Sequence, residues 1–137
     1  MKPIKLLFAT FFSLFPLSIH SNDRPNIVLI LIDDLGLTDI QAYGGEISTP
    51  NMDSLASEGM LFTNYHTTPE CAPSRAMLLT GMDNHNTGIP MIPEVLPWEY
   101  RNTPGYEGYL RDDALTIAEI LKPAGYRSYM TGKWHLA

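Results

Sequence analysis

Residues 26–36 read NIVLILIDDLG, and this stretch decides the fold class. After Asn26 comes a continuous apolar run rich in β-branched side chains, which is typical of a strand buried on both faces of a parallel or mixed sheet. The run ends at Asp33 and Asp34, and open α/β sheets bind ligands and metals at the carboxyl ends of their strands. We therefore expect an α/β fold with a candidate ligand site directly after this strand.

Helices and strands are expected to alternate downstream of this stretch. A short helix is predicted over residues 52–58 and is closed by Gly59, and residues 60–66 are predicted as a second strand. A further helix is expected over residues 74–79, with the serine at its start as a cap and Gly81 as its stop.

The second half of the chain is predicted to be irregular at first and regular again near its end. Prolines and glycines crowd residues 83–112, and a loop of that length is functional or a sign of something missing. An amphipathic helix is expected over residues 113–122, and a third strand over residues 126–133. The side chains predicted to face inward from this helix are Leu115, Ile117, Ala118 and Leu121. This order predicts a mixed or mostly parallel sheet with flanking helices.

Residues 1–21 are predicted to be a secretory signal peptide. Lys2 and Lys5 supply the positive region, and residues 6–17 supply an apolar region that Pro16 interrupts. An uncleaved membrane anchor or a lipid-free N-terminal tail is the alternative for this segment. No later apolar stretch is long enough for a membrane helix, so we expect an exported protein, periplasmic or secreted, without stable membrane insertion after cleavage.

The charge balance bears on the kind of partner. The chain has 9 Lys and Arg against 15 Asp and Glu, and removal of the signal peptide would make it more acidic. A general nucleic-acid binder needs a basic surface to offset phosphate charge, so no nucleic-acid partner is expected. A small anionic substrate stays possible, since a few cations can outweigh the global field locally.

Asp33 and Asp34 are the first candidate site residues. Two hard carboxylates suit calcium, with magnesium as a weaker alternative, and both can face one ion if the strand has given way to a turn, which Gly36 permits. A solvated turn in which the aspartates act as caps is the other interpretation of the same residues.

Cys71 is the only cysteine of the chain and stands at the start of residues 71–81, CAPSRAMLLTG. A single cysteine in an exported protein is reactive, paired with another chain, or incidental. Pro73 suits the first turn of a helix, whose free N–H groups attract anions. Arg75 adds a cation with a forked set of donors that fits sulfate or phosphate oxygens. The alternative is a small buried cysteine beside a surface arginine.

Lys133 and His135 form the second candidate pair. In a strand they would point to the same side, where they could bind an anion and move protons. An edge strand with its polar residues outward is the competing interpretation. His66 and His85 carry no pattern of their own and are expected to be surface or packing residues.

Taken together, these segments resemble the type I sulfatases, close to the arylsulfatase group within the alkaline-phosphatase-like superfamily. The resemblance is carried by residues 25–36, 43–45 (YGG), 49–51 (TPN), 71–81 and 125–135 (GYRSYMTGKWH). It implies a partial alkaline-phosphatase-like fold, with residues 24–137 as an N-terminal catalytic region truncated at its C-terminus. Glu70 and Thr131 stand where the family usually has smaller or apolar residues.

The resemblance also implies the chemistry. A maturation enzyme would oxidise Cys71 to formylglycine, whose hydrated form attacks the sulfur of a sulfate ester, with aryl sulfates as the expected substrates. Asp33, Asp34 and the modified Cys71 would bind calcium. Arg75 and Lys133 would hold the substrate, and His135 would assist collapse of the intermediate.

Other residues that the family needs, including its remaining metal ligands, lie further along its chains. We therefore expect the catalytic site to be incomplete here and the polypeptide to be inactive alone. Two alternatives stay open. One is a phosphonate or phosphate ester hydrolase of the same superfamily, and the other is a non-catalytic anion-binding fragment.

Overall fold

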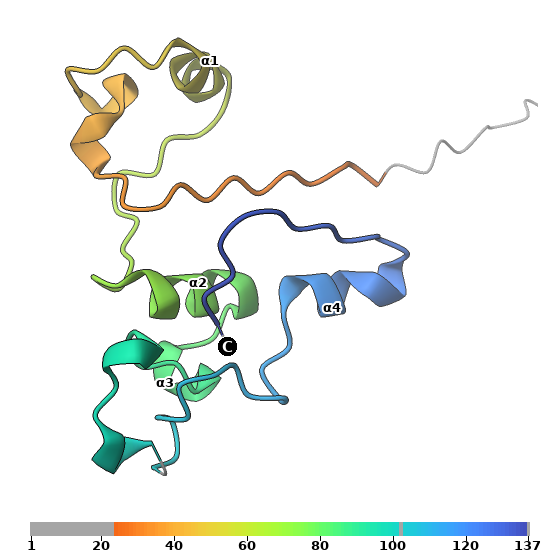
Figure 1. Ribbon diagram of the computed structural model, residues 1–137. Helices are drawn as coiled ribbons and strands as arrows, with labels where there is room; N and C mark the ends of the chain where they lie inside the picture. The colour runs from red at the N-terminus through yellow and green to blue at the C-terminus, as the bar shows by residue number, and fades with distance from the viewer. Residues whose placement is uncertain (1–23, 102, 137) are drawn as a thin grey trace, which may run out of the picture. The chain divides into compact units, whose positions relative to one another are not determined.

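The computed structural model describes residues 24–101 and 103–136. The predicted signal peptide therefore lies outside the described residues. The chain divides after Leu31 into two units, which are described separately. In the first unit, residues 24–31 form an extended segment without regular secondary structure (Figure 1). Every helix within residues 24–101 and 103–136, and every candidate site residue, belongs to the second unit, Ile32–Ala137.

The three predicted strands are not formed in the part of the chain that the structure describes. No strand pairing is present over residues 26–32, 60–66 or 126–133. The apolar pattern predicted strands, but a strand needs a neighbouring chain segment to pair with its N–H and C=O groups. Without one, side chains of the first predicted strand, which was expected to be buried on both faces, are exposed: Val28 by 80% and Ile30 by 74%.

The first helices of the second unit are short. The 3₁₀ turns η1 (Leu37–Asp39) and η2 (Gln41–Tyr43) precede helix α1 (Pro50–Glu58). Proline suits the first position of α1 because its missing N–H would be unpaired there anyway. Thr49 links η2 to α1, since its Oγ1 accepts a hydrogen bond from the N–H of Gln41 at 3.1 Å and donates one to the carboxylate of Asp53 at 3.1 Å. The prediction of a helix ending at Gly59 is confirmed.

Helix α2 (Cys71–Thr80) begins earlier than predicted. Glu70 is its N-cap residue, while Ser74 lies within the helix and its hydroxyl bonds to Thr68 instead. Ser74 as the cap was therefore wrong. The predicted stop is confirmed: Gly81 has a φ of +69° and its N–H donates to the carbonyl of Met77 at 2.8 Å. Glycine adopts this left-handed conformation without steric cost.

The stretch 83–112 is more ordered than predicted. It contains α3 (Asn84–Thr87), which Asp83 caps, and the 3₁₀ turns η3 (Pro93–Val95) and η4 (Trp98–Tyr100). Gly88 lies so close to the returning chain that a Cβ there would approach the carbonyl oxygen of Tyr109 to 2.7 Å. Local caps and turns replace the long structureless loop.

Helix α4 (Ile117–Leu121) is shorter than the predicted helix and is followed by η5 (Lys122–Ala124). Thr116 and Glu119 form a capping box, which fixes the start of the helix. Leu115 and Ile117 are 52% and 41% exposed, so the prediction that they face inward was wrong. Ala114 is buried in their place.

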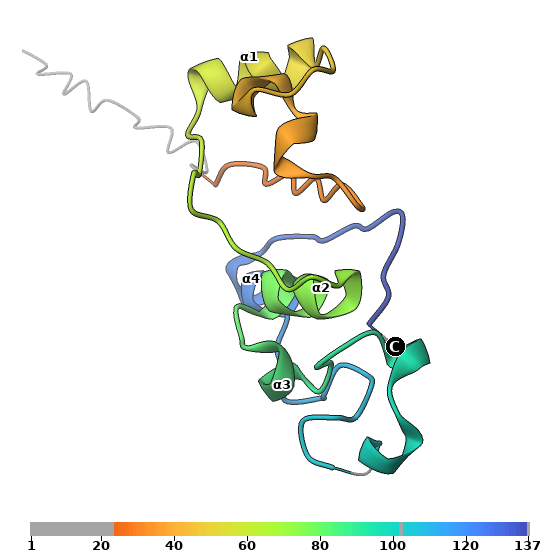
Figure 2. The same cartoon turned by 90° about the vertical axis from the view of Figure 1, so that its left-hand side faces the viewer.

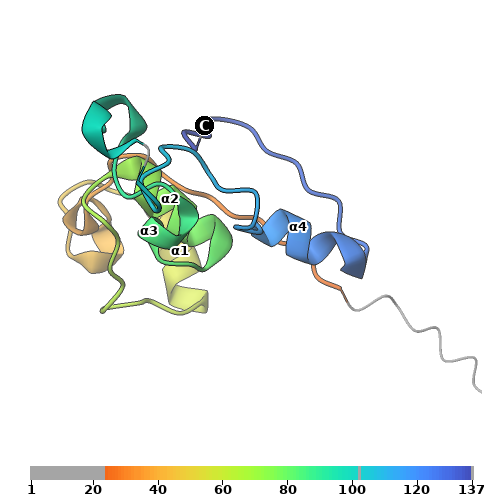
Figure 3. The same cartoon turned by 90° about the horizontal axis from the view of Figure 1, so that it is seen from below.

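The core lies beside α2. It consists of Ala72, Ala76, Ile89 and Leu136, with Leu79, Ile92 and Leu110 packed against it. Helices α3 and α4 both contact α2 (Figure 2). The η3 turn lies toward the beginning of α2 and α4 toward its end (Figure 3). Burial of Leu136 therefore brings the end of the chain against the helix that starts at Cys71. Among the helices in the described ranges, none has both the length and the apolar character needed to cross a bilayer.

Candidate active site

Helix α2 supplies the centre of the candidate site. Cys71 and Arg75 lie one helical turn apart and therefore share a face of the helix. Cys71 is half-buried and unpaired, and Arg75 is only 7% exposed. Small neighbours, Ala72 and Ala76, let the helix pack closely on its other side. The fold thus places a thiol and a buried cation together at the start of a helix.

The segment before Leu136 supplies the second part of the site. Because Leu136 is 1% exposed within the core, the three residues before it are carried to α2. Arg75 fixes them further, since its Nη1 donates to the carbonyl of Lys133 at 2.7 Å. His135 has a φ of +60°, a conformation that costs energy for a residue with a side chain and persists only where its surroundings hold it.

Lys133 and His135 both reach the thiol. The Nζ of Lys133 lies 3.5 Å from the Sγ of Cys71, and the Nδ1 of His135 lies 3.3 Å from it. The predicted common side of the two residues is thus observed, but not for the predicted reason. Residues 126–133 form no strand, and the left-handed backbone at His135 turns its ring toward Cys71.

Asp33 bridges the two cations. Its Oδ1 pairs with the Nη2 of Arg75 at 2.9 Å and its Oδ2 with the Nζ of Lys133 at 3.0 Å. The bond from Arg75, and then that from Lys133, hold the pKa of Asp33 below its ordinary value. Asp33 in turn raises the pKa of Lys133, with a smaller contribution from Cys71. Both partners are therefore charged at neutral pH.

Asp34 behaves differently from its neighbour. The chain turns at these two residues, as expected, and Asp34 has a φ of +53°. Within residues 24–101 and 103–136 its carboxylate makes no hydrogen bond or ion pair. Its role as a metal ligand stays a prediction.

The donors fit calcium in type but not in number. Calcium takes six to eight oxygen ligands, whereas the described residues contain no cluster of three or more acidic, histidine or cysteine side chains placed to hold a metal. Both oxygens of Asp33 are already paired with cations. Among the described residues, the acidic side chains therefore do not by themselves form a calcium site.

Around Cys71 the donors suit an oxygen-bearing group. Lys133 and His135 lie next to the side chain at this position. Arg75, one helical turn along α2, has one further donor that no described residue uses. Its Nε is buried and has no hydrogen-bond partner among the described residues. An unpaired buried donor is costly, and an oxygen atom nearby would relieve that cost.

The sequence prediction missed one member of this group, Glu94. Its carboxylate oxygens lie 3.1 and 3.2 Å from the Nε2 of His135. Glu94 stands in the stretch predicted to be a loop and belongs to no motif, so no sequence signal pointed to it. His66 and His85 lie outside the group, as expected; their ring nitrogens contact Asn64 and Asp83.

Comparison with known proteins gives the family. The sulfatase family model matches residues 25–137, and the chain belongs to this family. An arylsulfatase of Klebsiella aerogenes is 46% identical over 117 residues, which are 83% of this chain and 24% of that protein. Human arylsulfatase A is 46% identical over 114 residues, 82% of this chain and 21% of that protein.

An uncharacterized sulfatase of Schizosaccharomyces pombe is 47% identical over 116 residues, 82% of this chain and 21% of that protein. The chain thus spans between a fifth and a quarter of the length of these curated relatives.

Proposed function

We propose that this chain is the part of a sulfuric ester hydrolase of the arylsulfatase type that contains its nucleophile. Its membership of the sulfatase family supports this assignment, and one observation carries it. Lys133 and His135 come within 3.5 and 3.3 Å of the Cys71 side chain from more than fifty residues away in the sequence. Two groups that bind anions and move protons are thus gathered on one side chain.

Cys71 is proposed to be converted to formylglycine by a maturation enzyme that recognises the segment beginning at Cys71. The hydrated aldehyde would supply a hydroxyl nucleophile and a second hydroxyl that allows release of sulfate. Arg75 and Lys133 would bind the sulfuryl oxygens, and His135 would hold or move a proton at the position of the Cys71 side chain.

Calcium is proposed as the metal, with magnesium as the weaker alternative. Asp33, Asp34 and the modified residue 71 would bind it, and the ion would add positive charge where the sulfate group sits. Because the described residues contain no group of three or more histidine, cysteine or acidic side chains placed to hold a metal, we propose that residues 1–137 alone do not turn over a sulfate ester.

Family membership implies the alkaline-phosphatase-like α/β fold for the catalytic domain as a whole. The helices described above would be one part of it, and the extended segments would then become strands of its sheet. Export to the periplasm or the medium is also proposed, from the N-terminal sequence alone.

Two experiments test the assignment. Mass spectrometry of the tryptic peptide that carries Cys71, isolated from the native host, should show formylglycine; unmodified cysteine would favour the non-catalytic, anion-binding alternative. Rates on the sulfate and phosphonate esters of one phenol, measured on a full-length version that carries the modification, should favour the sulfate. A preference for the phosphonate would support the other hydrolase of the superfamily.

A further inference from the structure

Three side chains from distant parts of the sequence form a continuous line. The carboxylate of Glu94 lies 3.1 and 3.2 Å from the Nε2 of His135, and the Nδ1 of the same ring lies 3.3 Å from the Sγ of Cys71. Both nitrogens of the imidazole are therefore engaged, one by a carboxylate and one by the side chain at position 71.

The carboxylate determines what each nitrogen can do. A bond from its own backbone N–H, and then the bond from His135, keep the pKa of Glu94 below its ordinary value, so the group is ionised at neutral pH. An ionised carboxylate only accepts hydrogen bonds. The Nε2 of His135 must then carry a proton, which in the neutral ring leaves Nδ1 as an acceptor facing Cys71.

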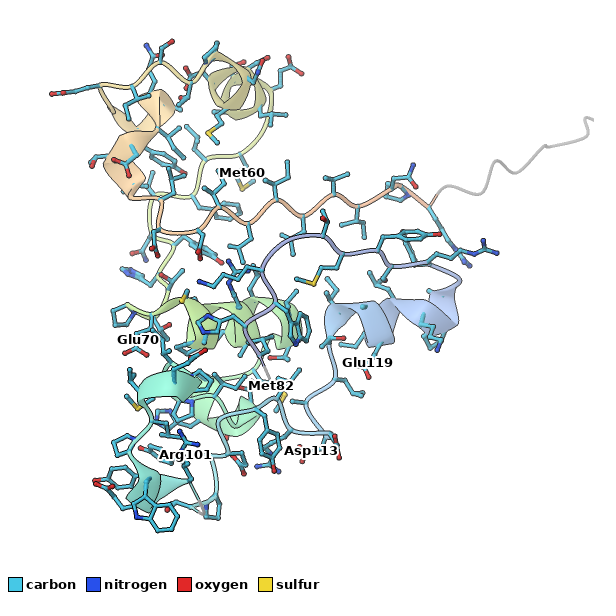
Figure 4. All side chains as sticks on the ribbon, viewed as in Figure 1. Met60, Glu70, Met82, Arg101, Asp113 and Glu119 are labelled. Atoms are coloured by element: carbon cyan, nitrogen blue, oxygen red, sulfur yellow. The ribbon has the colours of Figure 1, made fainter. Side chains whose placement is uncertain are left out.

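The position of Glu94 is built into the fold, although its side chain is 66% exposed. It lies in η3 between Ile92, which packs on the core, and Leu96, which is 5% exposed. The N–H of Ile92 donates to the Oε2 of Glu70 at 2.7 Å. Glu70, at the start of α2 (Figure 4), thus holds η3 next to the helix that bears Cys71.

We propose that Glu94 is a positioning residue that fixes the ring orientation and tautomer of His135, so that Nδ1 faces the group at position 71. A carboxylate bonded to the far nitrogen of a histidine performs this task in other nucleophilic sites. The chemical role of the His135 Nδ1 rests on the proposed function: this nitrogen would take the proton from a hydroxyl at position 71. The tautomer itself does not depend on that function.

The tautomer can be measured directly on the unmodified chain. Nitrogen-15 shifts of the imidazoles at neutral pH should show His135 protonated on Nε2. Glu94→Ala should shift the tautomer ratio of His135 by up to about fivefold toward the other form, since exposed charged pairs contribute a factor of at most that order. Glu94→Gln, which keeps the size of the side chain, should give a smaller shift in the same direction.

Glu99→Ala is the matched control. Glu99 is an exposed glutamate of the neighbouring η4 turn and has no side-chain partner in the described part of the chain, so its removal should leave His135 unchanged. The signal of His66, which contacts Asn64, is an internal reference. A His135 protonated on Nδ1 in the parent chain, or equal spectra for Glu94→Ala and Glu99→Ala, would overturn the proposal.

Kinetics separate this inference from the proposed function. In modified enzyme that cleaves aryl sulfates, Glu94→Ala should lower kcat with little change in KM, and Glu99→Ala should change neither. Absence of turnover in a full-length version that carries the modified residue 71 would count against the proposed function and leave the spectroscopic test of Glu94 intact. Turnover together with an unchanged tautomer would refute the role of Glu94 and leave the function standing.

Discussion

Leu136 is the residue whose truncation should disturb the candidate site most without touching its chemistry. Its side chain is 1% exposed and packs in the cluster formed with Ala72, Ala76 and Ile89. Replacing a buried leucine by alanine costs about 2–5 kcal/mol, through lost transfer free energy and the cavity left behind. Since Ala72 and Ala76 are small and belong to a helix, the site can collapse only partly, and we expect the upper half of that range.

The loss of the Leu136 side chain should change the geometry of the candidate site because Leu136 follows His135 directly in the chain. With the Leu136 side chain gone, the bonds from Arg75 to the carbonyl of Lys133 and from Leu110 to the carbonyl of residue 136 remain. The core packing that offsets the strained backbone of His135, whose φ is +60°, is lost. His135 and Lys133 should then leave Cys71, and the thiol should react faster with iodoacetamide. Domain stabilities are about 5–15 kcal/mol, so the expected loss is a large fraction of the total.

Urea unfolding followed by circular dichroism measures the free energy, and the alkylation rate of Cys71 in the absence of urea measures the site. Leu55→Ala is the matched control, because Leu55 is 71% exposed on α1 and the same substitution there should cost less than about 0.5 kcal/mol. Equal losses for the two variants, or an alkylation rate in Leu136→Ala no higher than in the parent, would refute the reasoning.

Three further outcomes are expected. The pKa of Asp33 is lowered in the folded chain, so Asp33 contributes stability that is present above its unfolded pKa of 3.8 and is lost as the pH falls through the folded pKa. Asp33→Asn should therefore flatten the fall in unfolding free energy between about pH 5 and about pH 2. An unchanged slope in the variant would contradict this. Gly81→Ala should lower the unfolding free energy by about 1 kcal/mol because φ is +69° there, whereas a neutral result in urea unfolding would show that α2 does not end in a left-handed residue. Glu70→Ala should speed hydrogen exchange of the Ile92 amide by roughly fivefold, because that amide loses its 2.7 Å bond to the Glu70 carboxylate. The amide of Gly81 is the reference that should not change. Equal protection of Ile92 in variant and parent would argue against Glu70 as the residue that holds η3 in place.

Local signals in the sequence predicted the helices better than the sheet. Gly59 and Gly81 end α1 and α2 as predicted, because helix stops depend on the conformation of a single residue. The start of α2 was misplaced, since Ser74 finds a partner in Thr68 that lies outside the helix. The strands were predicted from hydrophobicity alone, and a strand forms only where another chain segment pairs with it.

The sequence by itself determined the family and the residue types of the candidate site. The motifs around Asp33, Cys71 and Lys133 are continuous stretches, so they can be recognised without a structure. The roles assigned to these residues stay predictions. Their number and type already indicated a site for an anion, because thiol, guanidinium, ammonium and imidazole groups have that chemistry wherever they meet.

Which of these groups come into contact follows from the tertiary structure alone. Burial of Leu136 brings Lys133 and His135 to Cys71, and the paired carboxylate of Asp33 joins the two cations. Glu94 contacts His135 although it belongs to no sequence motif, because the position of η3 depends on the hydrogen bond between Glu70 and Ile92. Contacts between residues far apart in the chain follow from packing, and packing is a property of the folded chain that no short stretch of sequence contains.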